Sequence, residues 1–167
     1  AYHICEFYKK VFNLKIYGAI FFNHESERRT AEYVTRKITK AAARIYYNKQ
    51  KKLYLGDIKS KIDWGYARDF VEAAYNMMQL KKPNFFVIGS GKSYSIEYFA
   101  KKAFNHVGLN YKKYVVIDKN LIKKAKNKTL VADTKKAKEY FNFKTKTDLN
   151  KLIKIMMDND LKIELKE

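Results

Sequence analysis

A cluster of polar side chains follows directly after an apolar segment near the beginning of the chain. Residues 16–22 are apolar or aromatic except for Gly18, and the next seven positions carry amide, imidazole, carboxylate and guanidinium groups: Asn23, His24, Glu25, Glu27, Arg28 and Arg29. The apolar run predicts a buried strand, and open α/β sheets place their ligand sites at the carboxyl ends of strands. Imidazole and guanidinium groups are good donors to phosphate oxygens. The cluster therefore predicts a site for a phosphorylated ligand.

A second basic pair, Arg36 and Lys37, lies at the beginning of a helical pattern. Lys37 follows Tyr33 by one helical turn and could supply a point charge to a diphosphate. A structural interpretation of the first cluster stays open beside the functional one. In that interpretation its polar residues cap the next helix, while Glu25 and Glu27 form ion pairs with the two arginines.

The composition limits the class of protein. The chain has 167 residues, of which 47% are hydrophobic and 16% aromatic, enough for one domain with its own core. No apolar run approaches the ~18–20 residues that cross a bilayer, and residues 1–10 lack a signal-peptide pattern. The single cysteine, Cys5, excludes an internal disulfide and is typical of a reducing compartment. We therefore expect a cytoplasmic protein.

The net charge of +19 raises the alternative of a basic nucleic-acid-binding module. Only five of the 36 basic residues are arginine, however, and the other 31 are lysine. Base recognition depends strongly on bidentate arginine, and the lysines are spread along every segment, with a dense run only at 123–128. The charge therefore indicates a solvated surface first and an anionic small ligand second.

Three further patterns are poor matches to the chemistry they resemble. The turn 89–93 looks like the end of a phosphate-binding P-loop, but Phe86 stands where that motif needs its first glycine. Tyr-x-x-x-Lys, the proton-transfer pair of short-chain dehydrogenases, occurs at 33/37, 47/51, 98/102 and 140/144, close to the number expected by chance. The three histidines lack the closely spaced ligands of a zinc site.

Alternating helical and strand patterns predict an α/β fold with a large helical share. Helical periodicity occurs at 2–12, 30–47, 67–80, 95–104, 134–140 and 149–158, and apolar runs predict strands at 15–22, 53–55, 85–88 and 114–117. Thr30 is the expected cap of the second helix, whereas the first helix has no cap residue and is expected to be the end of a longer one that begins before Ala1. Trp64 follows a predicted loop and either stacks on a sugar or base or fills the core.

Five motifs occur in a characteristic order and spacing. They are Phe22-Asn23-His24-Glu25-Ser26, Val34-Thr35-Arg36-Lys37-Ile38-Thr39, Leu53-Tyr54-Leu55-Gly56, Asp63-Trp64-Gly65-Tyr66-Ala67 and Val87-Ile88-x-x-Gly91. In these motifs the chain resembles the GDP-mannose 4,6-dehydratase family, which belongs to the extended short-chain dehydrogenase/reductases. The resemblance covers about residues 15–160, and it involves only the carboxyl-terminal half of the family.

The resemblance implies an α/β fold that forms the C-terminal part of an extended, Rossmann-like short-chain dehydrogenase. Residues 1–29 would end the cofactor domain, 30–167 would form mainly the helical substrate-binding region, and 84–107 would return to the cofactor sheet. The glycine-rich dinucleotide turn and the catalytic Thr, Glu and Tyr-x-x-x-Lys pair of the family all precede the matching region. The catalytic residues are therefore expected upstream of Ala1, with none in this chain, and the chain alone is expected to be inactive.

In the complete enzyme, the family uses bound NADP to oxidise C4 of a GDP-hexose, remove water across C5–C6 and return the hydride to C6. By this resemblance His24 and Arg29 match cofactor-binding positions. The positions that match nucleotide-sugar contacts are Asn23, Glu32, Val34, Lys37 and Lys123. The implied partners are a nucleotide-diphosphate sugar, the N-terminal cofactor half and further copies of the chain in a homo-oligomer, without a membrane.

Four departures from the family pattern affect the expected specificity. Ile62 replaces an arginine that contacts substrate, and Lys123-Lys124-Ala125-Lys126 stands where the family has Arg-Pro-x-Glu; Glu27 replaces a proline and Thr30 a glycine. Lysine does not reproduce the bidentate geometry of arginine. We therefore predict a relative that acts on a different nucleotide-activated sugar. An epimerase or reductase of the same fold is the alternative within this class, because the fold hosts several chemistries.

Overall fold

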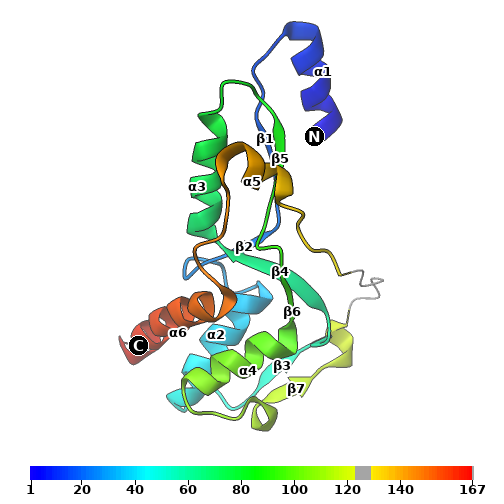
Figure 1. Ribbon diagram of the computed structural model, residues 1–167. Helices are drawn as coiled ribbons and strands as arrows, with labels where there is room; N and C mark the ends of the chain where they lie inside the picture. The colour runs from blue at the N-terminus through cyan, green and yellow to red at the C-terminus, as the bar shows by residue number, and fades with distance from the viewer. Residues whose placement is uncertain (123–128, 167) are drawn as a thin grey trace.

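The computed structural model describes residues 1–122 and 129–166. Figure 1 shows an elongated molecule in which two groups of elements meet at a central sheet. The upper group contains α1 (Tyr2–Phe12), β1 (Gly18–Phe21), α3 (Ala67–Met78), β5 (Phe85–Ile88) and α5 (Lys135–Phe141). The lower group contains α2 (Val34–Tyr46), β3 (Leu53–Leu55), α4 (Ile96–His106), β7 (Val115–Ile117) and α6 (Leu149–Lys166). The central sheet consists of β2 (Asn23–Glu25), β4 (Lys61–Tyr66) and β6 (Ser93–Ser95).

The upper group is built on a parallel pair of strands. β1 pairs with β5 from Gly18 opposite Phe85 to Phe21 opposite Ile88. A Cβ atom at Gly18 would lie 2.1 Å from Cδ1 of Phe85, so this position has no room for a side chain. Its apolar cluster comes from α3, β5 and the α5 region: Phe70, Ala73, Met77, Phe86, Ile88, Ala137 and Phe143.

The first helix begins without a side-chain cap, as the sequence predicts. Ala1 occupies the N-cap position of α1 and has no side chain that could accept a hydrogen bond from the first turn. Its carbonyl oxygen accepts the first helical hydrogen bond, from the backbone N–H of Cys5 at 3.1 Å. At the other end, Asn13 adopts a left-handed conformation with φ of 50° and ends the helix. Ala1 is therefore a structural residue at the start of α1, and the prediction of a longer helix stays a prediction.

The lower group is held by three helices that pack against one another. Ile38, Ala41, Ala42 and Ile45 follow the spacing i, i+3, i+4, i+7 and form the buried face of α2. That face contacts both α4 and α6. The two alanines leave little side-chain bulk between the helices, which favours a close approach of α2 to its neighbours.

Two buried carboxylates join α6 to α2. Asp160 is 1% exposed, and its Oδ1 lies 2.6 Å from Nη2 of Arg36. Burial raises the pKa of Asp160, while the hydrogen bond from Thr39 and the charge of Arg36 act in the opposite direction. Glu164, also 1% exposed, lies 3.6 Å from Arg44 and 3.7 Å from Lys49. These pairs compensate the two buried charges on α6.

The central sheet joins the two groups. β2 runs parallel to β4 with Asn23 opposite Trp64, and β6 runs antiparallel to β4 with Lys61 opposite Ser95. Trp64 is 3% exposed and its ring centroid lies 5.3 Å from that of Phe99. Of the two roles considered for Trp64, the structure therefore supports the filling of the core.

The predicted α/β class is confirmed, and each predicted helix and strand is present: α1, β3 and β5 have the predicted ends, and the others have shifted ends. Three short strands were missed: β2, β4 and β6, the first residues of β4 having been interpreted as a loop. α2 begins at Val34 with Tyr33 at the N-cap position, so the prediction that Thr30 caps it is wrong. The Thr30 hydroxyl instead donates to the carboxylate of Glu32 at 3.0 Å. α6 extends to Lys166, beyond the expected end at 158.

Residues 84–107 are divided between the two groups of elements. β5 pairs with β1 in the upper group, whereas β6 pairs with β4 and α4 packs against α2 and α6. Across the described residues, each helix is too short or too polar to cross a membrane.

Candidate functional site

The predicted polar cluster lies where the chain passes from the upper group into the central sheet. The backbone N–H of Phe22 still donates to the carbonyl of Ile88 at 2.9 Å, which continues the β1–β5 pairing. Asn23 then begins β2, and the strand pairs with β4 instead. The change of sheet within two residues places Asn23, His24 and Glu25 at the junction of the two groups (Figure 1).

Glu25 is the buried member of the polar cluster and contacts other residues of it. It is 2% exposed, accepts a hydrogen bond of 2.6 Å from the Thr35 hydroxyl, and its Oε2 lies 3.4 Å from Nε of Arg29. Burial raises the pKa of Glu25, whereas the Thr35 hydrogen bond and the charges of Arg29 and His24 lower it. The structural interpretation of the cluster therefore holds for Glu25, which ties β2 to the first turn of α2.

His24 is held in one orientation by its backbone and by aromatic rings. Its Nδ1 lies 3.0 Å from the carbonyl oxygen of Phe22, and its ring centroid lies 5.2 Å from Phe70 and 5.6 Å from Phe21. Because a carbonyl can only accept, Nδ1 carries the hydrogen in this contact. This contact leaves Nε2 as the ring nitrogen that faces an incoming ligand.

Arg29 presents a preorganised guanidinium group. Its side chain is 24% exposed, and its Cζ lies 3.4 Å from the ring centroid of Tyr33. Its Nε is buried without a hydrogen bond, so Glu25 acts on it through charge at 3.4 Å. A guanidinium that is stacked on a ring and keeps part of its fork accessible fits a phosphate oxygen.

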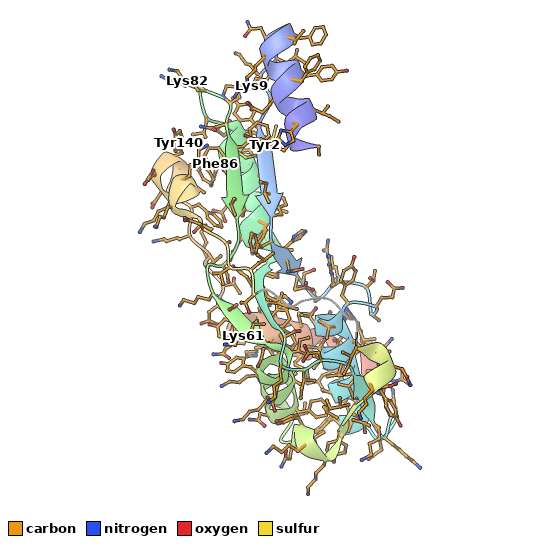
Figure 2. All side chains as sticks on the ribbon, turned by 90° about the vertical axis from the view of Figure 1, so that its right-hand side faces the viewer. Tyr2, Lys9, Lys61, Lys82, Phe86 and Tyr140 are labelled. Carbon is orange, nitrogen blue, oxygen red and sulfur yellow. The ribbon has the colours of Figure 1, made fainter. Side chains whose placement is uncertain are left out.

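A cavity of about 340 Å³ adjoins β2 on the side of Asn23. It is lined by Phe22, Asn23, Ser60, Lys61, Ile62, Asp63, Ile96 and Leu130. Ile62 occupies the position where the resembled family has an arginine, so this part of the wall is apolar. Lys61 supplies a cationic side chain beside it, and Figure 2 shows Lys61 at the level where the two groups meet. Sequence reasoning missed Lys61, although its position next to Ile62 was a signal.

Asp63 forms another part of the wall of this cavity. Its buried carboxylate accepts hydrogen bonds from the backbone N–H and hydroxyl of Ser90, at 2.9 and 2.6 Å, and from the backbone N–H groups of Gly91 and Ala132, both at 3.0 Å. One carboxylate thus joins β4, the turn after β5 and the segment that leads to α5. Sequence reasoning missed this role, because the partners are 27 to 69 positions away.

Lys37 lies in a different place from Asn23. It lines a second cavity of about 250 Å³, whose wall also carries Lys40, Lys52 and Tyr54. Three lysines around one depression suit an anionic group, and Lys40 and Lys52 were not predicted. The two cavities have no lining residue in common.

The other predicted substrate positions differ in their surroundings. Glu32 is exposed and is held by the Thr30 hydroxyl. Val34 is partly buried and packs against the apolar cluster of the lower group. Lys123 lies outside the described residues. The described structure therefore places Asn23 and His24 on β2 and Arg29 in the loop after it, whereas Glu32 precedes α2 and Val34 and Lys37 lie in its first turn.

One alternative location carries none of the predicted site residues. An open depression of about 910 Å³ runs along α4 to the segment 108–112 and is lined by residues outside the sequence motifs. The described residues contain no group of three histidine, cysteine or acidic side chains that could hold a metal ion.

The fold has many solved counterparts. The structure superposes with a TM-score of 0.87 on RMD from Pseudomonas aeruginosa complexed with NADPH, at 14% identity over 96% of this chain and 53% of that one. The TM-score is 0.81 for dTDP-glucose 4,6-dehydratase from Bacillus anthracis in complex with NAD, at 17% identity over 98% of this chain and 50% of that chain. The architecture is therefore that of the extended short-chain dehydrogenase/reductases, of which this chain covers about half.

The sequence comparisons define the family more closely. Residues 1–156 match the family described as GDP-mannose 4,6 dehydratase, and the chain belongs to this family. It is 41% identical over 160 residues to GDP-mannose 4,6 dehydratase 1 of Arabidopsis thaliana, covering 96% of this chain and 44% of the relative. The human GDP-mannose 4,6 dehydratase is 33% identical over 180 residues, covering 98% and 48%. The chain thus spans about half the length of the curated relatives it matches.

The family match extends further toward the beginning of the chain than the predicted resemblance. The family model includes Ala1 and the whole of α1, whereas the motifs covered only about residues 15–160. The lower limit of 15 is therefore corrected to Ala1. The placement of the catalytic residues upstream of Ala1 is not tested by this match and stays a prediction.

Proposed function

We propose that the chain forms the substrate-side part of an NADP-dependent nucleotide-sugar 4,6-dehydratase, a lyase. The observation that carries this proposal is the arrangement on β2. Asn23, the substrate-side candidate, lines a cavity of about 340 Å³, and His24, a cofactor-side candidate, follows it on β2. Arg29, the other cofactor-side candidate, lies in the loop after β2, with its Nε 3.4 Å from Oε2 of Glu25 on that strand. A site that must hold a dinucleotide and a sugar nucleotide next to each other needs both kinds of residue at one junction.

His24 and Arg29 are the residues of this chain that would hold the nicotinamide dinucleotide. The accessible part of the Arg29 fork suits a phosphate, and Nε2 of His24 accepts from a ribose hydroxyl. When bound, the dinucleotide accepts and returns a hydride. Asn23, Glu32, Val34, Lys37 and Lys123 would contact the nucleotide sugar, and the catalytic groups would come from the part of the relatives that this chain does not cover. The complete enzyme would be a homo-oligomer.

Ile62 sets the expected substrate apart from that of the relatives. An apolar wall beside Asn23 cannot form the bidentate contact of an arginine with a diphosphate or a sugar hydroxyl. Lys61 provides a positive charge beside Ile62 without that geometry. The expected substrate is therefore a different nucleotide-activated sugar, such as another hexose or a heptose, that depends less on a fork at this position.

Titration calorimetry of the 167-residue chain tests the binding part of the proposal. We expect GDP-mannose to bind, and Asn23→Ala and Arg29→Ala to weaken the binding of the sugar nucleotide and of NADP, respectively. Lys138→Ala, an exposed position on α5, removes one positive charge as Arg29→Ala does and is the matched control. The proposal would be contradicted if GDP-mannose, GDP and ATP bound with equal, weak affinity and neither Asn23→Ala nor Arg29→Ala changed these affinities.

To test turnover of the sugar nucleotide, the chain is combined with the part of a relative that it does not cover. Formation of a 4-keto-6-deoxy product supports a dehydratase. Formation of a product with an inverted C4 and an intact C6 hydroxyl would support the epimerase alternative instead.

A further inference from the structure

Arg36 lies next to Lys37 in a basic pair of the sequence, but its side chain is engaged inside the protein and is 12% exposed. Its Nε donates to both carboxylate oxygens of Asp160, at 2.9 and 3.1 Å, and its Nη2 lies 2.6 Å from Oδ1 of the same residue. Its Nη1 donates to the backbone carbonyl oxygen of Glu27 and, at 3.4 Å, to that of Arg29. All three nitrogens of the guanidinium group are therefore committed to contacts within the protein.

Asp160 fixes the position of Arg36 from the side of α6. Its side chain is 1% exposed and lies 124 positions away in the sequence. Figure 1 shows α6 beside α2 in the lower group, where the two helices pack against each other. A carboxylate that accepts from two nitrogens of one guanidinium group also fixes the orientation of that group. The packing of two helices therefore determines where Nη1 of Arg36 points.

The two carbonyl groups that Nη1 contacts belong to the loop that carries Arg29. Residues 26–33 form neither helix nor strand, and within them the backbone N–H of Arg29 donates to the carbonyl of Ser26 at 3.1 Å. Such connecting segments are more mobile than the elements they join. Glu27 stands where the family pattern has a proline, whose ring would restrict the backbone at this point. The contacts from Arg36 therefore have a larger part in fixing the loop of this chain.

The side chain and the main chain of Arg29 are held by different groups. Its Cζ lies 3.4 Å from the ring centroid of Tyr33, and its Nε lies 3.4 Å from Oε2 of Glu25. Its carbonyl oxygen is the group that Arg36 contacts. A side chain that is held before its ligand arrives loses less conformational entropy on binding.

We propose that Arg36, fixed by Asp160, is a positioning residue for the dinucleotide cofactor. It holds the loop 27–29 so that the guanidinium group of Arg29 is placed to meet a phosphate group of the cofactor. Arg36 does not contact the cofactor itself. This inference rests on the proposed function, in which Arg29 binds the dinucleotide.

Arg36→Lys tests the proposal because it keeps a positive charge beside Asp160. The single nitrogen of a lysine cannot reach the carboxylate and the two carbonyl oxygens together. Order parameters from NMR relaxation should be about 0.85 for the backbone amides of residues 28 and 29 in the unchanged chain and fall below about 0.6 in Arg36→Lys. The upfield shift that the Tyr33 ring causes in the Cδ protons of Arg29 should decrease. In calorimetric titration, NADP should bind about tenfold more weakly.

Arg44→Lys is the matched control. Arg44 also lies on α2 and also pairs with a buried carboxylate of α6, that of Glu164 at 3.6 Å, but it stands in the last turn of the helix, whereas Arg36 stands in the first. Both variants should lower the melting temperature, because both weaken the link between α2 and α6. Only Arg36→Lys should change the order parameters of the loop and the affinity for NADP. Equal effects of the two variants on the loop and on NADP would overturn the proposal.

A second pair of variants keeps the test decisive if Arg36→Lys does not fold. Arg36→Gln/Asp160→Asn removes both charges together, so no uncompensated charge stays buried, and Arg44→Gln/Glu164→Gln is its control. The first double variant should loosen residues 28 and 29 and weaken NADP, and the second should do neither. A loop as rigid in the first double variant as in the unchanged chain would overturn the proposal.

Two results separate this proposal from the proposed function. If Arg29→Ala weakens the binding of NADP and Arg36→Lys does not, the cofactor role of Arg29 stands and the positioning role of Arg36 is overturned. If Arg36→Lys loosens the loop and NADP binds equally well to the unchanged chain and to Arg29→Ala, the hold of Arg36 on the loop is supported and the cofactor role of Arg29 is overturned.

Discussion

Two residues that were not predicted to bind the ligand with certainty shape the surroundings of Asn23: Glu25 through its buried contacts and Ile62 as part of the cavity wall. Glu25 is buried beneath the cluster and interacts with Thr35 and Arg29. Ile62 forms an apolar part of the cavity wall next to Lys61. Glu25 helps to hold Arg29 in place, and Ile62 makes part of the cavity wall apolar.

Glu25→Gln should change how stability depends on pH. Burial raises the pKa of Glu25 above its ordinary value of 4.5, so the folded state binds this proton more tightly than the unfolded state. The corresponding stability is fully present below about pH 4.5 and is lost as the pH rises through the raised pKa. In urea denaturation, the free energy of unfolding of the unchanged chain should therefore fall relative to Glu25→Gln as the pH rises from about 4.5. The exposed Glu139→Gln is the control, and a difference that stays constant with pH would contradict the prediction.

Ile62→Arg should strengthen the binding of a GDP-sugar. A guanidinium group at the cavity wall can form charge-assisted hydrogen bonds with a diphosphate, worth roughly 1.5–3 kcal/mol, or about tenfold or more in affinity. Calorimetric titration with GDP-mannose measures the change, and salt should weaken the gain. Ile62→Met preserves the volume without the charge and should bind as the unchanged chain does. Equal affinities for Arg, Met and Ile at this position would place the sugar nucleotide elsewhere.

Among the elements, β4 connects the halves of the molecule. It pairs with β2 and β6, carries Ile62 and Lys61 to the cavity, and places Asp63 against two segments from the distant sequence. A six-residue strand thus positions the site and holds the polypeptide around it.

Asp63→Asn should destabilise the fold strongly, although the two side chains have nearly the same size. Both carboxylate oxygens of Asp63 accept hydrogen bonds from backbone N–H groups. In asparagine an NH₂ group replaces one of these oxygens, so the N–H groups on that side would face another donor and lose their acceptor. The expected loss is about 2–3 kcal/mol of unfolding free energy, since buried unsatisfied donors cost this much. Urea denaturation measures it, and exchange of the amides of Ser90 and Ala132 should accelerate.

Asp133→Asn is the matched control for that experiment. Asp133 is exposed and accepts a hydrogen bond from the backbone N–H of Lys135, so its loss should cost no more than about 1 kcal/mol. Equal stability of the two variants would show that the bonds of Asp63 contribute little.

For the whole molecule, charge and exposed apolar surface have separate explanations. The positive charge is distributed, and part of it is neutralised locally, for example between Lys59 and Glu97 and between Lys154 and Asp158. Exposed apolar side chains lie on α1 and β1, on α3 at Val71, Tyr75 and Met78, and at further positions of other elements. The distributed charge therefore favours solubility, and it lies apart from the exposed apolar side chains.

The chain should not bind random duplex DNA appreciably at physiological salt. Scattered lysines neutralise few neighbouring phosphates at once, so we expect a dissociation constant weaker than about 10⁻⁴ M at ~150 mM salt. Fluorescence anisotropy with a labelled duplex measures it, and GDP-mannose binding in the same buffer serves as the control. Micromolar affinity that falls steeply with added salt would support the nucleic-acid module.

Local sequence was sufficient for some features and not for others. The periodicity of Ile38, Ala41 and Ile45 predicted α2, because a helix forms from hydrogen bonds within one segment. The strands β2 and β6 have three residues each and are largely polar, so they carry no period that could be recognised. They exist because β4, from another part of the chain, offers hydrogen-bonding partners.

By itself, the sequence determined the α/β class, the main helices, the family motifs and the gathering of possible phosphate donors between Asn23 and Arg29. These properties depend on residue types and on short spacings. Tertiary structure alone decided that Glu25 is a buried anchor, that Asp63 joins three segments and that Lys37 lies in a cavity separate from Asn23. These features depend on how the segments lie against one another, which is fixed only when the helices and sheets pack together.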